Sequence, residues 1–96
     1  MANLFATEKE LLVLRQLRDS PAGLYGLQLV SHSEGKLKRG TVYVTLGRLE
    51  EKGFVASRTN PDGGHAGLPR PVYRITGLGQ RALAAGELMG FDAAEA

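Results

Sequence analysis

Hydrophobic side chains recur at helical spacing in four segments of the chain, and two short segments between the third and the fourth alternate instead. The first helical segment has its apolar residues at Leu11, Leu14 and Leu17. Thr7 and Glu10 have the spacing of a capping box, in which each side chain bonds to the other residue's backbone N–H. We therefore expect a first helix over about residues 7–18, which ends before the proline and glycine of the DSPAG segment.

Two more helices are predicted in the segment that follows. Leucine and valine recur from Leu24 onward and predict a short second helix that ends before Gly35. A third helix is expected over about residues 40–52, because one narrow apolar stripe is formed there by Val42, Leu46 and Leu49. Gly53 follows at a position that favours a left-handed helix cap. The connector around Leu37, between these two helices, is expected to be brief and extended.

The hydrophobic period changes to two after the third helix. Residues 54–59 and 72–75 alternate between apolar and polar side chains, as strands with one buried face do. Tyr73 and Ile75 are expected on one side of the second strand. The glycine- and proline-rich segment between the two strands is typical of a turn, so the pattern predicts a β-hairpin with a long tip.

Helical spacing returns near the C-terminus. Thr76 can cap a helix over about residues 78–89, and residues 92–96 are expected to form a flexible tail. The expected apolar stripe of this helix is Leu78, Ala82, Ala85 and Met89, with Leu83 and Leu88 on its flank. Three helices, a two-stranded β wing and a C-terminal helix make a winged helix-turn-helix domain, which is α+β and mostly α. We expect a single such domain over residues 1–96.

Composition agrees with one small globular domain and narrows its chemistry. The chain has 96 residues, of which 43% are hydrophobic and none is cysteine. The absence of cysteine excludes disulfides, thiolate metal sites and cysteine nucleophiles. No uncharged apolar run approaches the ~20 residues that a membrane span needs, and the charged N-terminal segment is unlike a signal peptide. We expect a cytoplasmic protein with no membrane partner.

The net charge of +2 hides an uneven distribution. Residues 35–58 carry six basic side chains against two acidic ones, whereas residues 82–96 carry three acidic side chains and no basic one. A basic centre in a small domain is typical of a protein that binds a polyanion such as nucleic acid. A solvated surface with chance clustering would give the same balance, so charge alone leaves both interpretations open.

The sequence offers no catalytic constellation, and we predict no enzyme activity, no metal and no cofactor. His32 and His65 lack neighbouring ligands at a metal-binding spacing. The adjacent Glu50 and Glu51 point in different directions on a helix and make a poor acid–base pair. The DGG turn lacks the Gly-Lys-Ser/Thr ending of a phosphate-binding loop.

Three motifs, in order along the chain, resemble the PadR family of bacterial transcription regulators. The segment GTVYVTL at residues 40–46, followed by RLEEKGFV at 48–55, is similar to the recognition helix of that family. LYG at residues 24–26 resembles the entry to the family's second helix, and VYRIT at 72–76 resembles its wing strand and the start of its last helix. The resemblance covers about residues 8–85.

This resemblance implies a homodimeric repressor that binds double-stranded DNA at a palindromic operator. Many members of the family carry a much longer C-terminal helix or several helices, whereas only about 13 residues follow Leu83 here. The sequence therefore resembles a shorter subgroup of the family. Residues 77–91 are expected to form the dimerisation helix, and a small-molecule effector is not indicated.

The third helix is the expected DNA reader, because the N-terminal part of such a helix contacts base edges. At 100° per residue its outward face carries the predicted base contacts, with Arg48 placed for a guanine or a phosphate. The basic residues just before the helix are expected to contact phosphates, and the wing residues the backbone or minor groove. For Tyr43, packing on the domain and reaching a phosphate both stay open. The predicted DNA-binding residues are Lys36, Lys38, Arg39, Thr41, Tyr43, Val44, Thr45, Arg48, His65 and Arg70.

Apolar residues that one small domain cannot cover predict a two-fold homodimer through the terminal helices. The predicted interface residues are Leu4, Phe5, Leu12, Leu83, Leu88 and Phe91. Two other functions remain open, namely a winged-helix protein-interaction module without a nucleic-acid role and an RNA-binding domain. The basic residues beside the third helix favour DNA binding over a protein-interaction role. The scarcity of aromatic residues counts against RNA binding.

Overall fold

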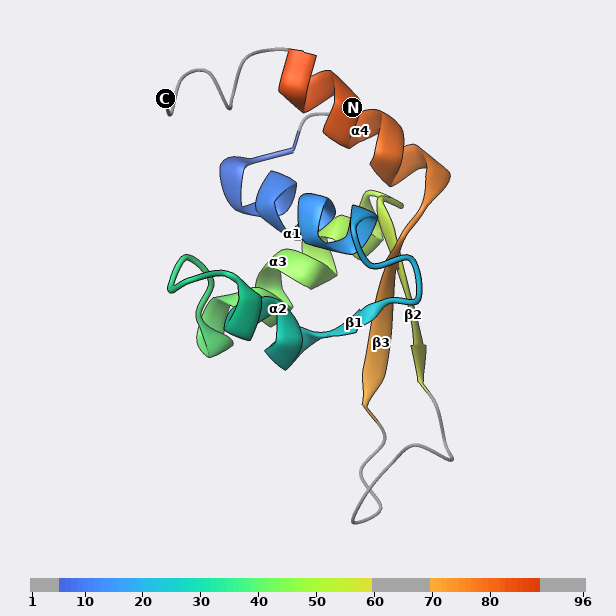
Figure 1. The fold of residues 1–96 in the computed structure, drawn as a ribbon. Helices are drawn as coiled ribbons and strands as arrows, with labels where there is room; N and C mark the ends of the chain where they lie inside the picture. Colours follow the sequence, from blue (N-terminus) through green and yellow to red (C-terminus); the bar gives the residue numbers. More distant parts are fainter. Residues whose placement is uncertain (1–5, 60–69, 89–96) are drawn as a thin grey trace.

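Within the part of the chain that the structure describes, four helices and three strands follow one another in the order α1, β1, α2, α3, β2, β3, α4 (Figure 1). The computed structural model describes residues 6–59 and 70–88. The elements span Glu8–Arg18 (α1), Leu24–Tyr25 (β1), Gly26–His32 (α2), Arg39–Glu51 (α3), Val55–Thr59 (β2), Pro71–Ile75 (β3) and Gly77–Leu88 (α4). The mostly helical α+β class and the winged helix-turn-helix arrangement are confirmed.

Helix α1 begins at the predicted capping box. The Glu10 N–H donates to Thr7 Oγ1 at 3.2 Å, and the Thr7 N–H donates to Glu10 Oε1 at 2.8 Å. Glu10 is only 2% exposed, and its Oε1 also lies 2.8 Å from Lys52 Nζ at the end of α3. The carboxylate that caps α1 therefore also ties it to α3, and the charge of Lys52 is paired inside the domain.

The sheet contains a strand that the sequence did not predict. Its order is β1-β3-β2 and both pairings are antiparallel, so β3 lies in the middle. The prediction that Leu24 begins the second helix was wrong, because Leu24 pairs with Tyr73 in the sheet and α2 begins two residues later. Gly23 turns the chain into β1 with a φ of +99°, a conformation that side chains other than glycine rarely adopt.

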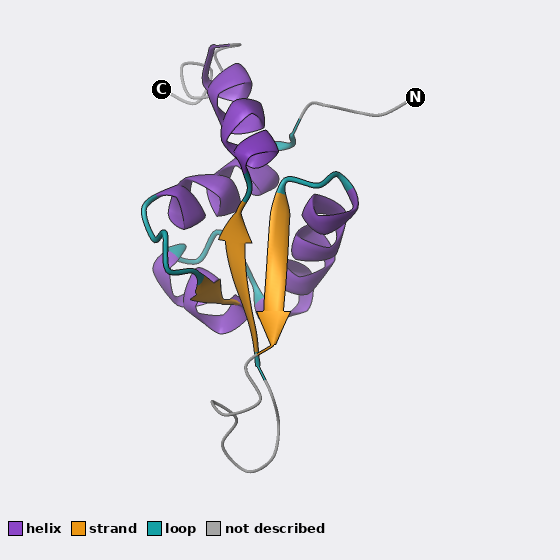
Figure 2. Cartoon of the chain, turned by 90° about the vertical axis from the view of Figure 1, so that its right-hand side faces the viewer, coloured by secondary structure: helices purple, strands orange, loops and turns teal. Residues whose placement is uncertain are grey.

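One face of the sheet packs on the helices and the other is open. Figure 2 shows the sheet from its open face, with α1, α2 and α3 behind it. Tyr73 is 7% exposed on the packed face, where its cross-strand neighbour Ser57 donates to Glu50 Oε2 at 2.7 Å. Burial raises the pKa of the Tyr73 hydroxyl, and the charges of Glu50 and Tyr43 raise it further. Arg58 and Arg74, on the same two strands, are exposed.

A single hydrophobic core lies between α1, α3 and the packed face of the sheet. Each of α1, α2 and α3 contributes at least one completely covered leucine, and Phe54 closes the core where α3 ends. The most deeply buried residues are Val13, Leu14, Leu17, Leu29, Val42, Leu46 and Leu49. The predicted stripe of the third helix is thus confirmed.

Helix α4 packs through a face rotated from the predicted one: Ala82 is buried as expected, but Ala85 is exposed, and Met89 lies outside the described residues. Leu78 is 41% exposed, whereas the buried residues of α4 are Gly79, Ala82, Leu83 and Gly86. A Cβ atom on Gly86 would lie 2.7 Å from Leu11 Cδ2, and one on Gly79 would lie 2.8 Å from Ile75 Cγ1. The absence of side chains at these glycines lets α4 approach α1 and the end of β3 closely, so the hydrophobicity pattern pointed to the wrong face.

Candidate nucleic-acid interface

The outward face of α3 is exposed along its length because the helix is buried only on its opposite side. The α3 residues that point away from the core are Gly40, Thr41, Tyr43, Val44, Gly47, Arg48 and Glu51. An added Cβ atom at Gly40 or Gly47 would meet nothing within 4 Å. The face therefore combines bare backbone with the exposed side chains of Tyr43 and Val44, which are 46% and 54% accessible.

Thr41 and Thr45 have different surroundings, although both were predicted to contact bases. The Thr41 hydroxyl caps α3, since it donates to the Lys38 carbonyl at 3.2 Å and accepts from the Lys38 N–H at 3.4 Å. Thr45 is only 7% exposed, and its hydroxyl donates to the Thr41 carbonyl at 3.1 Å. A base contact by Thr45 is thus contradicted, because its side chain lies on the core side of the helix.

The connector between α2 and α3 presents basic side chains at the start of α3. Leu37 is 1% exposed and anchors the connector in the core, and the Leu37 N–H donates to Ser33 Oγ at 2.9 Å. Lys36 and Lys38, on either side of it, are exposed. Arg39 is exposed as the first residue of α3, so exposed cations lie on both sides of the Leu37 anchor, and Lys36 also lines a hollow with α1 residues such as Leu12.

A hollow of about 310 Å³ lies next to this face. Its lining residues, from β1, α2, α3 and the start of β3, are Tyr25, Gly26, Leu27, Tyr43, Arg70 and Pro71. A Cβ atom on Gly26 would lie 2.6 Å from Tyr43 Cε1, so the Tyr43 ring packs against the bare backbone of α2. The structure brings Arg70 and Tyr43 to one hollow, and Tyr25 and Leu27 are lining residues that the sequence reasoning missed. The LYG motif at residues 24–26 contains Tyr25 and was the signal that could have found it.

The predicted dimer residues separate into three groups. Leu83 is 2% exposed and belongs to the core of its own chain, so its assignment to a subunit interface was wrong. Leu12 is half-buried against the core and Leu88 is 88% exposed. The remaining interface residues and one wing residue lie outside the described parts of the chain: Leu4, Phe5, Phe91 and His65.

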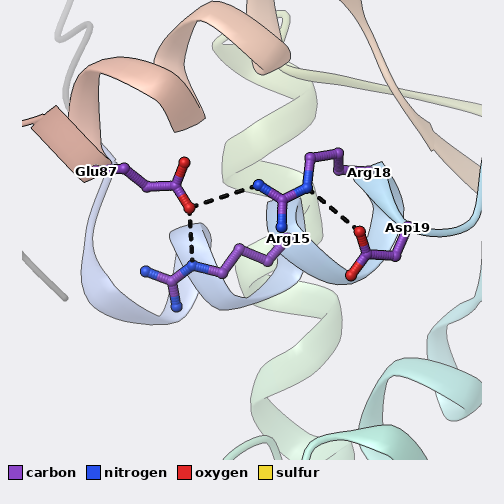
Figure 3. A network of polar contacts seen from close by, with 4 residues as sticks. All are labelled: Arg15, Arg18, Asp19 and Glu87. Carbon is purple, nitrogen blue, oxygen red and sulfur yellow. Dashed lines mark hydrogen bonds and ion pairs between the residues drawn. The ribbon is translucent and has the colours of Figure 1, made fainter.

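Ion pairs hold α4 against α1 near Leu88. Glu87 Oε2 lies 3.5 Å from Arg15 Nε and 3.5 Å from Arg18 Nη1 (Figure 3). Arg18 Nε also lies 3.3 Å from Asp19 Oδ1. These arginines are therefore engaged between α1 and α4, and Arg15 also lines a hollow together with Lys36 of the α2–α3 connector.

Residues 6–59 and 70–88 contain neither a candidate metal cluster nor a candidate membrane span. No group of three or more histidine, aspartate or glutamate side chains that could hold a metal ion occurs in this part of the chain. No helix of this part is long and apolar enough to cross a membrane.

An exposed, basic-flanked third helix joined to a β wing defines the winged helix-turn-helix class. A family model gives the particular family, since the model of the PadR-like family of transcriptional regulators matches residues 13–85. The chain therefore belongs to the PadR-like family, which is one of transcription regulators and not of enzymes. A comparison with curated proteins gave no match.

Solved structures from the same family share the fold. A PadR family regulator from Eggerthella lenta is 30% identical, with a TM-score of 0.73 over 91% of this chain and 75% of that one. A PadR family regulator from Clostridium difficile is 22% identical, with a TM-score of 0.73 and 90% of each chain covered. Bacillus subtilis PadR in complex with operator DNA is 23% identical, with a TM-score of 0.72 over 81% of this chain and 45% of that one.

Proposed function

We propose that the protein is a sequence-specific DNA-binding repressor that acts in the cytoplasm as a homodimer on a two-fold-symmetric operator. The observation that carries the proposal is the exposed outward face of α3, with Lys36, Lys38 and Arg39 held together at its start. Arg48 is exposed one turn from its end. A helix of this kind enters the major groove while adjacent cations neutralise phosphates. The operator complex of Bacillus subtilis PadR, which has the same fold, supports this arrangement.

The proposed DNA contacts are of two kinds: some position the domain on the phosphate backbone, and others distinguish the bases. Lys36, Lys38 and Arg39 lie around the buried anchor at Leu37, so they can set the register of the domain on the phosphate backbone. The hollow that contains Tyr43 and Arg70 adds a second backbone contact, because a tyrosine hydroxyl and a guanidinium both donate to phosphate oxygens. The outward face of α3 lies between these two backbone contacts and makes the base contacts that distinguish one DNA sequence from another.

Dimerisation through α1 and α4 would place two such faces on one duplex. Leu88 is 88% exposed at the end of α4, and Leu12 is half-buried on α1. A closed two-fold dimer is the commonest way to cover such residues. It would set the two α3 helices about 34 Å apart, which is one turn of DNA.

Selection of bound sequences from a random duplex pool tests the proposal directly. We expect enrichment of a two-fold-symmetric motif whose half-sites are one helical turn apart. A pool without enrichment would refute DNA reading and favour a protein-docking role for the same helix. An enriched motif without symmetry would leave DNA binding in place and refute the dimer.

Two charge variants then distinguish phosphate contacts from a general effect of charge. Lys38→Ala should weaken binding to all duplexes and lower the salt slope by roughly one per subunit. Arg81→Ala, at an exposed position of α4, removes the same charge far from the connector and should leave the slope unchanged. Equal slopes for the two variants would contradict the assignment of the connector to phosphate.

A further inference from the structure

Val44 is an exposed apolar side chain in the middle of a face that is otherwise bare or polar. It is 54% accessible, and among the described large hydrophobic residues only Leu88 is more exposed. Gly40 precedes it by four residues and Gly47 follows by three, so both glycines flank it on the same helix surface. Nothing lies within 4 Å of a Cβ atom placed on either glycine. Val44 therefore projects from a strip of uncovered backbone.

This geometry matters because valine is short. A side chain of that length touches the floor of the major groove only if the helix backbone approaches the base edges closely. Glycines on either side permit such an approach, since no side chain separates the backbone from the groove there. Gly47, in the helix interior, lowers helix stability by about 1 kcal/mol relative to alanine, and packing within the domain does not require a glycine there.

The threonine hydroxyls nearby already have local partners. The Thr41 hydroxyl bonds to both the N–H and the carbonyl of Lys38, and the Thr45 hydroxyl donates to the Thr41 carbonyl. Val44 has no polar group at all. The centre of this face thus offers an apolar contact where many recognition helices offer a hydrogen bond. The one apolar group that base pairs present in the major groove is the C5-methyl of thymine.

We propose that Val44 reads the C5-methyl group of a thymine at one fixed position in each operator half-site. The inference rests on the proposed DNA-binding function and adds the chemical group that is recognised. Contact between the valine isopropyl group and the thymine methyl removes both from water, so it favours an A·T pair in one orientation. Because the operator is two-fold symmetric, the contact occurs once in each half-site.

Uracil substitution tests this contact without changing base pairing. The full-length protein is titrated by fluorescence anisotropy against its selected operator, with each thymine replaced in turn by deoxyuridine. One symmetric pair of positions should lose affinity by about fourfold in one half-site and about fifteenfold in both, the effect of one buried methyl group each. The other thymines should show no such loss.

Val44→Ala identifies the protein partner of that methyl group. The variant should bind the thymine operator more weakly, and it should bind the thymine and uracil operators equally at the sensitive position. Leu78→Ala is the matched control, because Leu78 is 41% exposed on α4 and should keep the full preference for thymine. Circular dichroism should show an unchanged fold for both variants, since neither side chain is in the core.

Three results would overturn the inference. The first is a flat uracil scan, the second is a selected half-site without thymine, and the third is a uracil penalty that persists in Val44→Ala. In each case the protein still binds its selected operator, so the proposed function would stand. Failure to enrich any duplex would instead remove the function on which the inference rests.

Discussion

Exchanging glycine for alanine at two helical positions should have opposite effects on stability. Gly79 lies in the first turn of α4 and Gly47 in the interior of α3. A Cβ atom at Gly79 would collide with the backbone of Phe54 and lie 2.8 Å from Ile75 Cγ1, whereas one at Gly47 would meet nothing within 4 Å. The same chemical change therefore adds a clash at one position and only helix propensity at the other.

The magnitudes follow from these surroundings. Gly47→Ala should gain about 0.5–1 kcal/mol of unfolding free energy, the propensity difference between the two residues in a helix interior. Gly79→Ala should cost about 2–4 kcal/mol, because overpacking typically costs ~1–3 kcal/mol and α4 must move away from Phe54. That movement also lengthens the 3.0 Å hydrogen bond from the Thr76 N–H to the Phe54 carbonyl, which contributes about 1 kcal/mol.

Thermal unfolding followed by circular dichroism measures both effects. At roughly 4–8 °C per kcal/mol, Gly47→Ala should raise Tm by roughly 2–8 °C and Gly79→Ala should lower it by at least about 8 °C. All samples need one protein concentration, because the proposed dimerisation would make Tm depend on concentration. Gly47→Ala should also bind its operator about tenfold more weakly despite its greater stability, since the added methyl group keeps the helix from the groove. A Gly79→Ala protein as stable as the parent, or a destabilised Gly47→Ala protein, would refute this reasoning.

Three further predictions concern the rest of the structure. Glu10→Gln keeps an acceptor for the cap but removes the buried carboxylate that pairs with Lys52. Urea denaturation should therefore show a free energy of unfolding lower by about 1–3 kcal/mol. An unchanged denaturation midpoint would contradict the stabilising role of the pair. The raised pKa of Tyr73 means that folding favours its neutral form, and this contribution is complete below about pH 10, the unfolded value, and lost as pH rises through the folded value. The unfolding free energy of Tyr73→Phe should therefore fall less steeply above pH 10 than that of the parent, and parallel pH profiles would count against it. Leu88→Asp should sediment as a monomer at micromolar concentration without loss of helix content, and a persistent dimer would place the interface elsewhere.

The local sequence determined most of the helices. Thr7 and Glu10 lie three residues apart, and their spacing alone predicted the cap that begins α1. Thr76 likewise caps α4 as predicted, since the Gly79 N–H donates to its Oγ1 at 3.0 Å. The cations that were predicted beside the third helix are exposed, and Leu37 between the two lysines is buried. Signals of this kind act over one helical turn and need no knowledge of the rest of the fold.

The tertiary structure decided what depends on distant partners. The local sequence predicts that Leu24 lies in a helix. In the structure it lies in a strand instead, because it pairs with Tyr73, which is distant along the chain. The local sequence predicts only a capping role for Glu10. The fold adds an ion pair, because it brings Lys52 Nζ to 2.8 Å from the Glu10 carboxylate. Gly79 and Gly86 read as weak points in a helix, but they form its buried face because Phe54 and Leu11 need the space that a side chain would fill. Hydrophobic periodicity shows which apolar side chains are buried, but a glycine has no side chain and adds nothing to that pattern. The face through which α4 packs on the domain is therefore evident only in the packed structure.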